Sequence, residues 1–367
     1  MISLLHFRLI ERQSVDLVQP KSFITETLEG YLHPEVFKLI SSHIDIDSPG
    51  TKIIETSELF NIDTLGKDEI KDLVNLKRVN DIRYLNKYFE AINRRLNSGS
   101  YFIGCAETYD QRKERIFRRF PFGFSHIFYV IDFIYKRIFP KWSITKWLYF
   151  YITHGMNRVL SRAEVLGRLI SCGFRIVEVK DIKGHMYFVT IRSCEPAYDL
   201  KPSYGLLFKM NRLGKDGKNI GVYKFRTMHP FAEYLQEYVY SMNNLDEGGK
   251  FKDDFRITAW GKVLRKLWID ELPMLVNFFS GDLKLVGVRP LSNHYLSLYD
   301  EEFQKRRIKY KPGLIPPYYA DMPKKLDDII LSEINYLDQF DKHPVKTDIK
   351  YFFKSFYNII FKGARSR

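Results

Sequence analysis

The sequence is poor in the residues that build disulfide frameworks and metal centres. Its 367 residues include three cysteines and nine histidines, and neither type clusters at the spacing of metal ligands. Cys105, Cys172 and Cys194 are far apart and form no CxxC motif. This pattern excludes a disulfide-stapled fold and a zinc site, and it indicates a reducing compartment.

Long apolar runs are missing as well. The opening MISLLHFRLIERQ has too short an apolar stretch for a signal peptide, and no run of about 18 apolar residues predicts a membrane-spanning helix. The chain nevertheless carries a net charge of +14, and 16% of its residues are aromatic. A basic surface predicts an anionic partner, which is a nucleic acid, an anionic lipid or a phosphorylated small molecule.

Residues 1–200 alternate between strand-like and helix-like segments, which predicts an α/β domain with a largely parallel sheet. The expected strands are 51–55, 72–76, 101–105, 174–179 and 187–191. A helix is expected over 79–96, and Ser161 is expected to cap another. Over about 50–193 this order loosely resembles the back half of class I methyltransferases. Residues 1–50 lack the glycine-rich turn that holds a cofactor in such folds, so we interpret 1–200 as a degenerate Rossmann-like domain for scaffolding or regulation.

An aromatic, basic insertion interrupts this domain at residues 124–152, FSHIFYVIDFIYKRIFPKWSITKWLYFYI. Two apolar arms flank Pro140. The residues around the break are Lys136, Arg137, Lys141 and Lys146, together with Trp142 and Trp147. Neither arm is long enough to span a bilayer. The pattern is typical of a helix–proline–helix that dips into one leaflet. A pair of core helices with a proline corner is the alternative.

Residues 201–367 form a second predicted domain. A polar turn at 214–218 joins strands at 206–210 and 222–225, and alternation along the second strand places Lys224 and Arg226 on one face. Further on, KVLRKLWIDELPMLVNFFSGDLKLVGVRP places Asp270 and Glu271 side by side at a helix start, among several cations. Helix N-termini and cations attract phosphates. Ordinary helix-starting acids are the alternative interpretation.

Four ordered blocks in this half carry a specific resemblance: YKFRTM, DDFRIT-x-x-G-x-x-LRK, IDELP-x-L-x-N-x-x-x-GD-x-x-LVG-x-RP, and KPG. From about residue 202 to 313, and weakly to 367, the chain resembles the bacterial sugar transferase family of monotopic polyprenyl-phosphate phosphoglycosyl transferases. The resemblance implies an α+β domain that transfers a sugar-1-phosphate from a UDP-sugar to undecaprenyl phosphate. UMP is released in this initiating step of bacterial surface polysaccharide synthesis.

The resemblance also implies roles for individual residues. Asp270 corresponds to the nucleophile that forms a phosphosugar-aspartyl intermediate, and Glu271 to the carboxylate that binds Mg²⁺. Arg289 is the candidate for holding a phosphate or the uridine. Further candidates for substrate binding are Lys224, Arg226, Arg256, Arg265 and Asp254, the last of which is either structural or a second acidic group.

The chain departs from this family in lacking a long apolar re-entrant helix before the predicted hairpin. We hypothesise that the insertion at 124–152 replaces this anchor. The tail from residue 347 predicts a basic, aromatic amphipathic helix that lies on a membrane surface or packs on the domain. The expected location is the cytoplasmic face of the bacterial inner membrane, as a peripheral or monotopic protein.

Other functions are compatible with the same sequence. The main alternative is a non-catalytic nucleotide-sugar-binding or scaffold protein of a glycan assembly complex. Nucleic-acid binding has only the positive charge in its favour and no recognisable motif, so no nucleic-acid partner is expected. The expected partners are a UDP-sugar, undecaprenyl phosphate, a membrane surface and other glycan-assembly enzymes.

Overall fold

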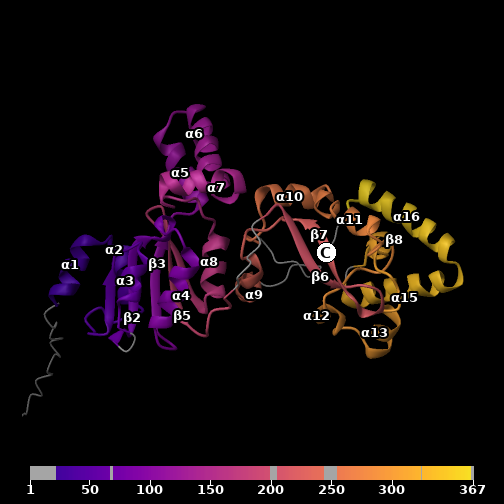
Figure 1. Cartoon of the computed structure of the whole chain (residues 1–367), viewed down its shortest axis with the longest axis horizontal. Coiled ribbons are helices and arrows are strands. Elements are labelled where there is room, and N and C mark those ends of the chain that lie inside the picture. The colour runs from indigo at the N-terminus through magenta and orange to yellow at the C-terminus, as the bar shows by residue number, and fades with distance from the viewer. Residues whose placement is uncertain (1–21, 67–68, 199–204, 244–253, 324, 365–367) are drawn as a thin grey trace, which may run out of the picture.

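The computed structural model describes residues 22–66, 69–198, 205–243, 254–323 and 325–364. An N-terminal α/β part and a C-terminal part of small sheets and helices follow one another along the long axis (Figure 1). The boundary predicted between residues 200 and 201 lies outside the described residues.

A five-stranded sheet of order β1-β2-β3-β5-β4 forms the centre of the N-terminal part. Its strands are β1 (Thr51–Ile54), β2 (Asp72–Arg78), β3 (Tyr101–Ala106), β4 (Phe174–Ile182) and β5 (His185–Arg192). The predicted parallel pairing holds for β1, β2 and β3, whereas β5 runs antiparallel to both of its neighbours. Lys183 and Gly184 explain the reversal. Both have positive φ, as a two-residue hairpin turn requires, so β4 and β5 are consecutive antiparallel strands.

Helices on this sheet bury its aromatic core, in which Phe89, Phe102 and Phe188 meet edge to face. They are α1 (Phe23–Tyr31), α2 (Pro34–Ser41), α3 (Leu59–Asp63), α4 (Leu85–Arg95) and α8 (Arg162–Ser171). The helix expected over 79–96 begins only at Leu85, because 79–81 forms a separate 3₁₀ turn. The predicted cap is present: the Ser161 hydroxyl accepts the Glu164 N–H at 3.1 Å.

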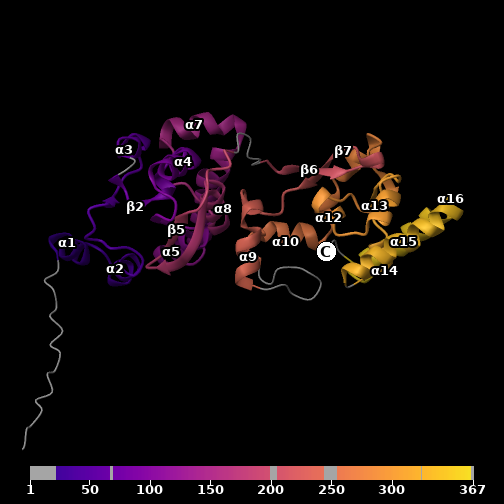
Figure 2. The same ribbon diagram turned by 90° about the horizontal axis from the view of Figure 1, so that it is seen from below.

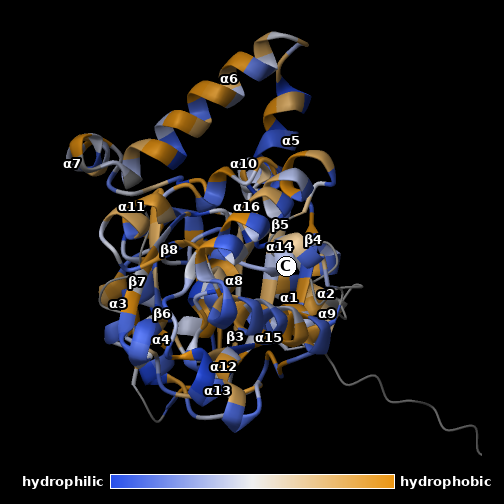
Figure 3. Ribbon diagram, turned by 90° about the vertical axis from the view of Figure 1, so that its right-hand side faces the viewer, coloured by the Kyte–Doolittle hydropathy of each residue, from blue (hydrophilic) through white to orange (hydrophobic). Residues whose placement is uncertain are grey.

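The insertion at 124–152 forms a helical projection on one side of this domain (Figure 3). The insertion comprises α6 (Phe124–Phe133) with a π-helical continuation to Ile138, a 3₁₀ turn through Pro140, and α7 (Ser143–Thr153). The helix α5 (Tyr109–Arg119) leads into it. The predicted helix–proline–helix is therefore confirmed. Arg137 differs from the predicted exposed basic cluster, because it is buried and paired with Glu164.

The C-terminal part begins with the predicted hairpin, β6 (Leu207–Leu213) paired antiparallel with β7 (Asn219–Phe225). A parallel pair, β8 (Lys284–Val286) and β9 (Gly313–Ile315), lies further on. The helices are α9 (Gln236–Asn243), α10 (Ala259–Lys266), α11 (Met274–Phe279), α12 (Asn293–Leu296), α13 (Glu301–Arg307), α14 (Tyr318–Asp321), α15 (Leu326–Lys342) and α16 (Pro344–Phe361). Seen from below, α15 and α16 lie at the end of the molecule farthest from α1 (Figure 2).

The two parts share one core at their junction. Leu235 and Val239, from the turn Ala232–Leu235 and from α9, are buried in the same apolar cluster as the helices of the N-terminal sheet. Gly167 of α8 lies so close to the Phe231 carbonyl that an added Cβ would be 2.2 Å from its oxygen. Residues 231–239 of the C-terminal half therefore pack against the N-terminal domain.

Within the described residues, no helix has the length and apolar character needed to cross a bilayer.

Candidate active site

The two adjacent carboxylates lie in a 3₁₀ turn, Ile269–Glu271, between α10 and α11. Trp268 starts this turn in the left-handed region at φ 63°, and its indole N–H donates to the Tyr319 hydroxyl at 3.0 Å. Pro273 stands directly before α11. The expected placement at a helix start is confirmed, with the pair just ahead of α11.

Glu271 is a buried carboxylate with two partners. Its Oε1 accepts from the Lys224 ammonium at 2.6 Å, and its Oε2 accepts from the Tyr319 hydroxyl at 3.0 Å. Burial raises the pKa of Glu271, but Lys224, Arg289 and the Tyr319 hydrogen bond outweigh burial and leave the pKa below its ordinary value. Glu271 is therefore ionised at neutral pH.

Asp270 is half-buried, and its environment acts in the opposite direction. Burial and the adjacent negative charge of Glu271 raise the pKa of Asp270 above its ordinary value, against the opposing effects of Lys224 and Arg265. A carboxylate with a raised pKa is a stronger base and nucleophile once it is ionised. The two neighbours thus differ: the pKa of Glu271 is lowered and the pKa of Asp270 is raised.

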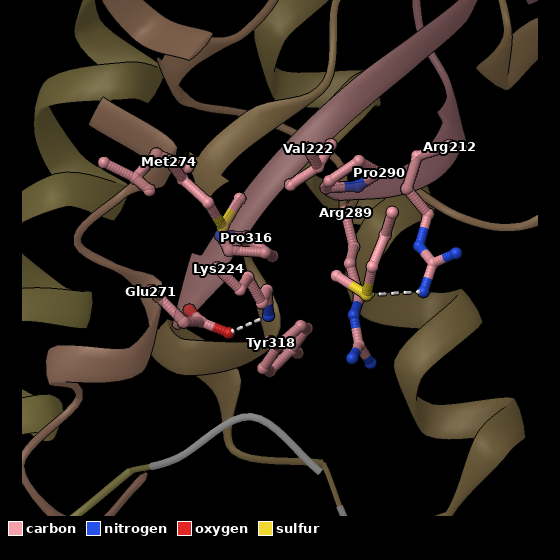
Figure 4. Close-up of a pocket in the computed structure, with 11 residues that line it drawn as sticks. Arg212, Val222, Lys224, Glu271, Met274, Arg289, Pro290, Pro316 and Tyr318 are labelled. Carbon is pink, nitrogen blue, oxygen red and sulfur yellow. Dashed lines mark hydrogen bonds and ion pairs between the residues drawn. The ribbon is translucent and has the colours of Figure 1, made fainter. Parts of the chain in front are cut away.

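A small cleft opens next to Glu271. Lys224 and Arg212 reach it from the β6–β7 hairpin, and Arg289 reaches it from the loop after β8 (Figure 4). Burial and the charge of Arg289 lower the pKa of Arg212. Cations that oppose one another across a cleft favour an anionic ligand between them, and arginine is suited to phosphate.

The expected site residues divide between the cleft and its surroundings. Lys224, Glu271 and Arg289 line the cleft. Arg265 is not among the residues that line the cleft. Its Nε donates to the Thr227 hydroxyl at 2.8 Å, and its charge acts on Asp270. Asp270 is next to Glu271 in the chain but is not among the residues that line the cleft.

The remaining candidates lie outside the cleft lining. Arg256 and Asp254 form a buried bidentate ion pair, with distances of 2.8 Å and 2.7 Å. The Arg226 guanidinium lies over the Phe208 ring at 4.8 Å and donates to the Gly205 carbonyl at 3.2 Å. These contacts hold the strands and the loop around the site, and a role for these residues in substrate binding stays a prediction.

Sequence reasoning missed three residues of this site, Arg212, Tyr318 and Tyr319. The signal for Arg212 was available: Met210 pairs with Val222 across the hairpin, so alternation places Arg212 on the face that carries Lys224. The tyrosines follow Pro316 and Pro317 on the four-residue helix α14, and no local pattern marks them.

Metal binding depends on how many oxygen donors the cleft offers. Among the described residues, no group of three or more His, Cys, Asp or Glu side chains is arranged to hold a metal ion. Mg²⁺ usually binds one or two carboxylates together with substrate phosphate oxygens. Glu271 is ionised and keeps spare lone pairs on its oxygens beside Lys224 and Tyr319. The residues fit a metal site that a bound phosphate completes.

Part of the chain is similar to known proteins. Residues 185–362 match the model of the family described as bacterial sugar transferase. Galactosyl transferase CpsE of Streptococcus agalactiae serotype III is 35% identical over 149 residues, which are 39% of this chain and 32% of that protein. A UDP-N-acetylgalactosamine-undecaprenyl-phosphate N-acetylgalactosaminephosphotransferase of Aeromonas hydrophila is 35% identical over 30% of this chain and 24% of its own length. The chain thus spans a third or less of these two relatives.

The N-terminal domain has a weaker counterpart among solved structures. A complex between the Haloferax volcanii Trm112 methyltransferase activator and a putative methyltransferase aligns with 46% of this chain and 94% of its own, at 11% identity and a TM-score of 0.29. Similarity at this level supports no statement about function, so the methyltransferase-like origin of residues 1–200 stays a prediction.

Proposed function

Because residues 185–362 match the model of the bacterial sugar transferase family, we propose that the protein transfers a sugar-1-phosphate from a UDP-sugar to undecaprenyl phosphate and releases UMP. The observation that carries the proposal is the cleft lined by an ionised Glu271 and the cations Arg212, Lys224 and Arg289. Asp270, whose pKa is raised, is the neighbour of Glu271 in the chain. The Aeromonas relative is named for a UDP-sugar donor and an undecaprenyl-phosphate acceptor.

The proposed reaction has two displacements at one phosphorus atom. In the first, a carboxylate oxygen of Asp270 attacks the phosphorus that bears the sugar, the bond to the bridging oxygen breaks, and UMP leaves with that oxygen. In the second, an oxygen of the lipid phosphate attacks the same phosphorus, and Asp270 leaves as a carboxylate. A covalent intermediate divides one difficult transfer between two anions into two steps.

The cations make the first displacement feasible, because a carboxylate and a diphosphate repel each other. Lys224 holds Glu271 in place, at 2.6 Å, and contributes positive charge beside Asp270. Arg212 and Arg289 are assigned to the phosphate oxygens, on which negative charge grows in the transition state. Glu271 is the proposed ligand of Mg²⁺, which when bound would neutralise diphosphate charge.

The direct test is UMP release from a panel of UDP-sugars in the presence of Mg²⁺ and undecaprenyl phosphate. Catalytic release that requires the lipid phosphate is expected for one donor or a few. An equal amount of undecaprenol, which lacks the phosphate, serves as the matched control and is expected to give no turnover. Tight UDP-sugar binding without release from any donor would contradict the proposal and favour the scaffold alternative.

The pH dependence of the rate follows from Asp270. The attacking carboxylate must be ionised, and its pKa is raised above the ordinary 3.8 by burial and by Glu271. The value of kcat/KM should therefore rise with pH through an acid limb that lies above 3.8. Glu271→Gln removes the neighbouring negative charge, so the limb should move to lower pH even where the rate is reduced. A limb that stays in place in this variant would rule out the assignment.

A further inference from the structure

The helices α6 and α7 display apolar side chains outward instead of burying them. Exposed side chains on the two helices include Phe124, Ile127, Ile131, Ile144, Trp147 and Ile152. Ile144 and Trp147 are 77% and 73% exposed. So many exposed apolar side chains on two consecutive helices are uncommon on soluble monomers and mark a site of interaction.

The base of this projection is firmly attached, so the exposure does not result from loose packing. Arg112 of α5 forms a bidentate pair with Asp132 of α6, at 2.6 Å and 2.7 Å, and also contacts the buried Glu107 at 3.2 Å. Arg137 pairs with Glu164 of α8 and donates to the Val159 carbonyl. These buried contacts hold α6 at a fixed angle to the domain.

The charges on the projection indicate what covers it. Residues 124–152 contain one acidic residue, Asp132, and it is paired with Arg112. Lys146 is exposed beside Trp142 and Trp147. Tryptophan and lysine flanking apolar helices are typical of the headgroup level of a membrane, and cations without exposed acids favour anionic lipids.

Helices of the transferase part face the same side of the molecule. α16 buries a polar stripe, Thr347, Tyr351, Ser355 and Asn358, and leaves Phe353, Phe356 and Ile360 exposed. Phe279 at the end of α11 is 81% exposed. In Figures 1 and 3, α11 and α16 lie on the side from which α6 and α7 project.

The dimensions also fit a single leaflet. α6 with its π-helical continuation covers residues 124–138, which spans about 22 Å at about 1.5 Å per residue. Half of a bilayer's hydrocarbon core is about 15 Å thick. The arm can therefore enter one leaflet obliquely from the surface.

We propose that the α6–α7 projection inserts into one leaflet of an anionic bilayer while α11 and α16 rest on its surface. This arrangement places the turn with Asp270, between α10 and α11, at the level of the headgroups. The choice of a lipid as the partner rests on the proposed function, in which the acceptor is a lipid phosphate.

Flotation with vesicles tests the surface without any substrate. The full-length protein is mixed with phosphatidylcholine vesicles with and without phosphatidylglycerol. Ile131→Ser/Ile144→Ser/Trp147→Ser changes three exposed side chains of the projection. Phe23→Ser/Phe60→Ser is the matched control, because these side chains are 83% and 74% exposed but lie on α1 and α3, away from the projection (Figure 1).

The wild-type protein and the control should float with the anionic vesicles, and the projection variant should bind about tenfold more weakly or worse. Binding of that variant equal to wild type would overturn the proposal. A second result would also overturn it: light scattering without lipid shows a wild-type dimer and a monomeric projection variant, and flotation shows no vesicle binding. A second copy of the chain would then cover the surface.

A second measurement separates this proposal from the proposed function. In detergent micelles with a short-chain polyprenyl phosphate, the projection variant should release UMP at the wild-type rate. Retained rate together with lost flotation supports a role confined to the membrane. Absence of UMP release from the wild-type protein, with flotation intact, would contradict only the proposed function.

Discussion

Asp270→Asn is expected to lower the rate of UMP release by about 10⁴-fold or more. An amide of the same shape cannot attack phosphorus, so the covalent route closes while the fold stays unchanged. Burial and Glu271 oppose a negative charge at Asp270, so the neutral amide is expected to leave stability equal to wild type or higher. The measurement is steady-state UMP release with donor and lipid acceptor.

Two controls separate chemistry from binding. Calorimetric affinity of the variant for the UDP-sugar should stay within about tenfold of wild type, because Arg212, Lys224 and Arg289 still line the cleft. Asp338→Asn removes an aspartate of α15 that forms a half-exposed ion pair with Arg306 of α13, and it should leave the rate unchanged. A rate for Asp270→Asn close to wild type would mean that another group is the nucleophile.

Lys224→Met is expected to destabilise the protein by about 3–5 kcal/mol, because it leaves Glu271 charged and buried without its cation. Glu271 is 4% exposed, and Lys224 is 2.6 Å from its Oε1. The double variant Lys224→Met/Glu271→Gln should recover most of the loss, since neither side chain of the pair then carries a charge. Urea denaturation at neutral pH gives the free energies of unfolding.

The stability difference between the wild type and Lys224→Met should depend on pH. The folded-state pKa of Glu271 is depressed, so its pair stabilises the wild type above the unfolded pKa, and this stabilisation is lost as pH falls through the folded pKa. In Lys224→Met the cation is gone and burial raises that pKa. The difference between the two proteins should therefore shrink on acidification.

Lys354→Met is the matched control for this experiment. Lys354 also forms an ion pair, at 2.8 Å with Asp321, but its side chain is 52% exposed. Its loss should cost about 1 kcal/mol or less. Equal effects of the two lysine substitutions would contradict the assignment of Lys224–Glu271 as a buried pair.

Local patterns predicted the elements around the site. Alternation along the strands and a polar turn predicted the β6–β7 hairpin. Both depend on neighbours within a few residues, which a sequence displays directly. Asp270 and Glu271 were recognised from the four ordered sequence blocks that resemble the family. Pro273, which stands directly before α11, explains why the two acids precede that helix.

Contacts between distant segments could not be predicted in this way. Tyr319 reaches Glu271 across 48 positions, and no spacing rule connects them. The orientation of α16 was also left open, because its periodicity gives two faces but not which one is buried. The structure buries the face of Tyr351 and Asn358, where Asn358 donates to the carbonyls of Tyr319 and Ala320. Hydrogen bonding of those carbonyls explains why the more polar face turns inward.

The most direct test of the account is a reaction of the protein with UDP-sugar in the absence of any acceptor. The covalent mechanism predicts a burst of about one UMP per protein molecule, and mass spectrometry should find a phosphosugar adduct on the peptide that carries Asp270. Adding undecaprenyl phosphate should remove the adduct. No UMP without the acceptor, despite turnover with it, or an adduct on a different residue would contradict the assignment of Asp270 as the nucleophile.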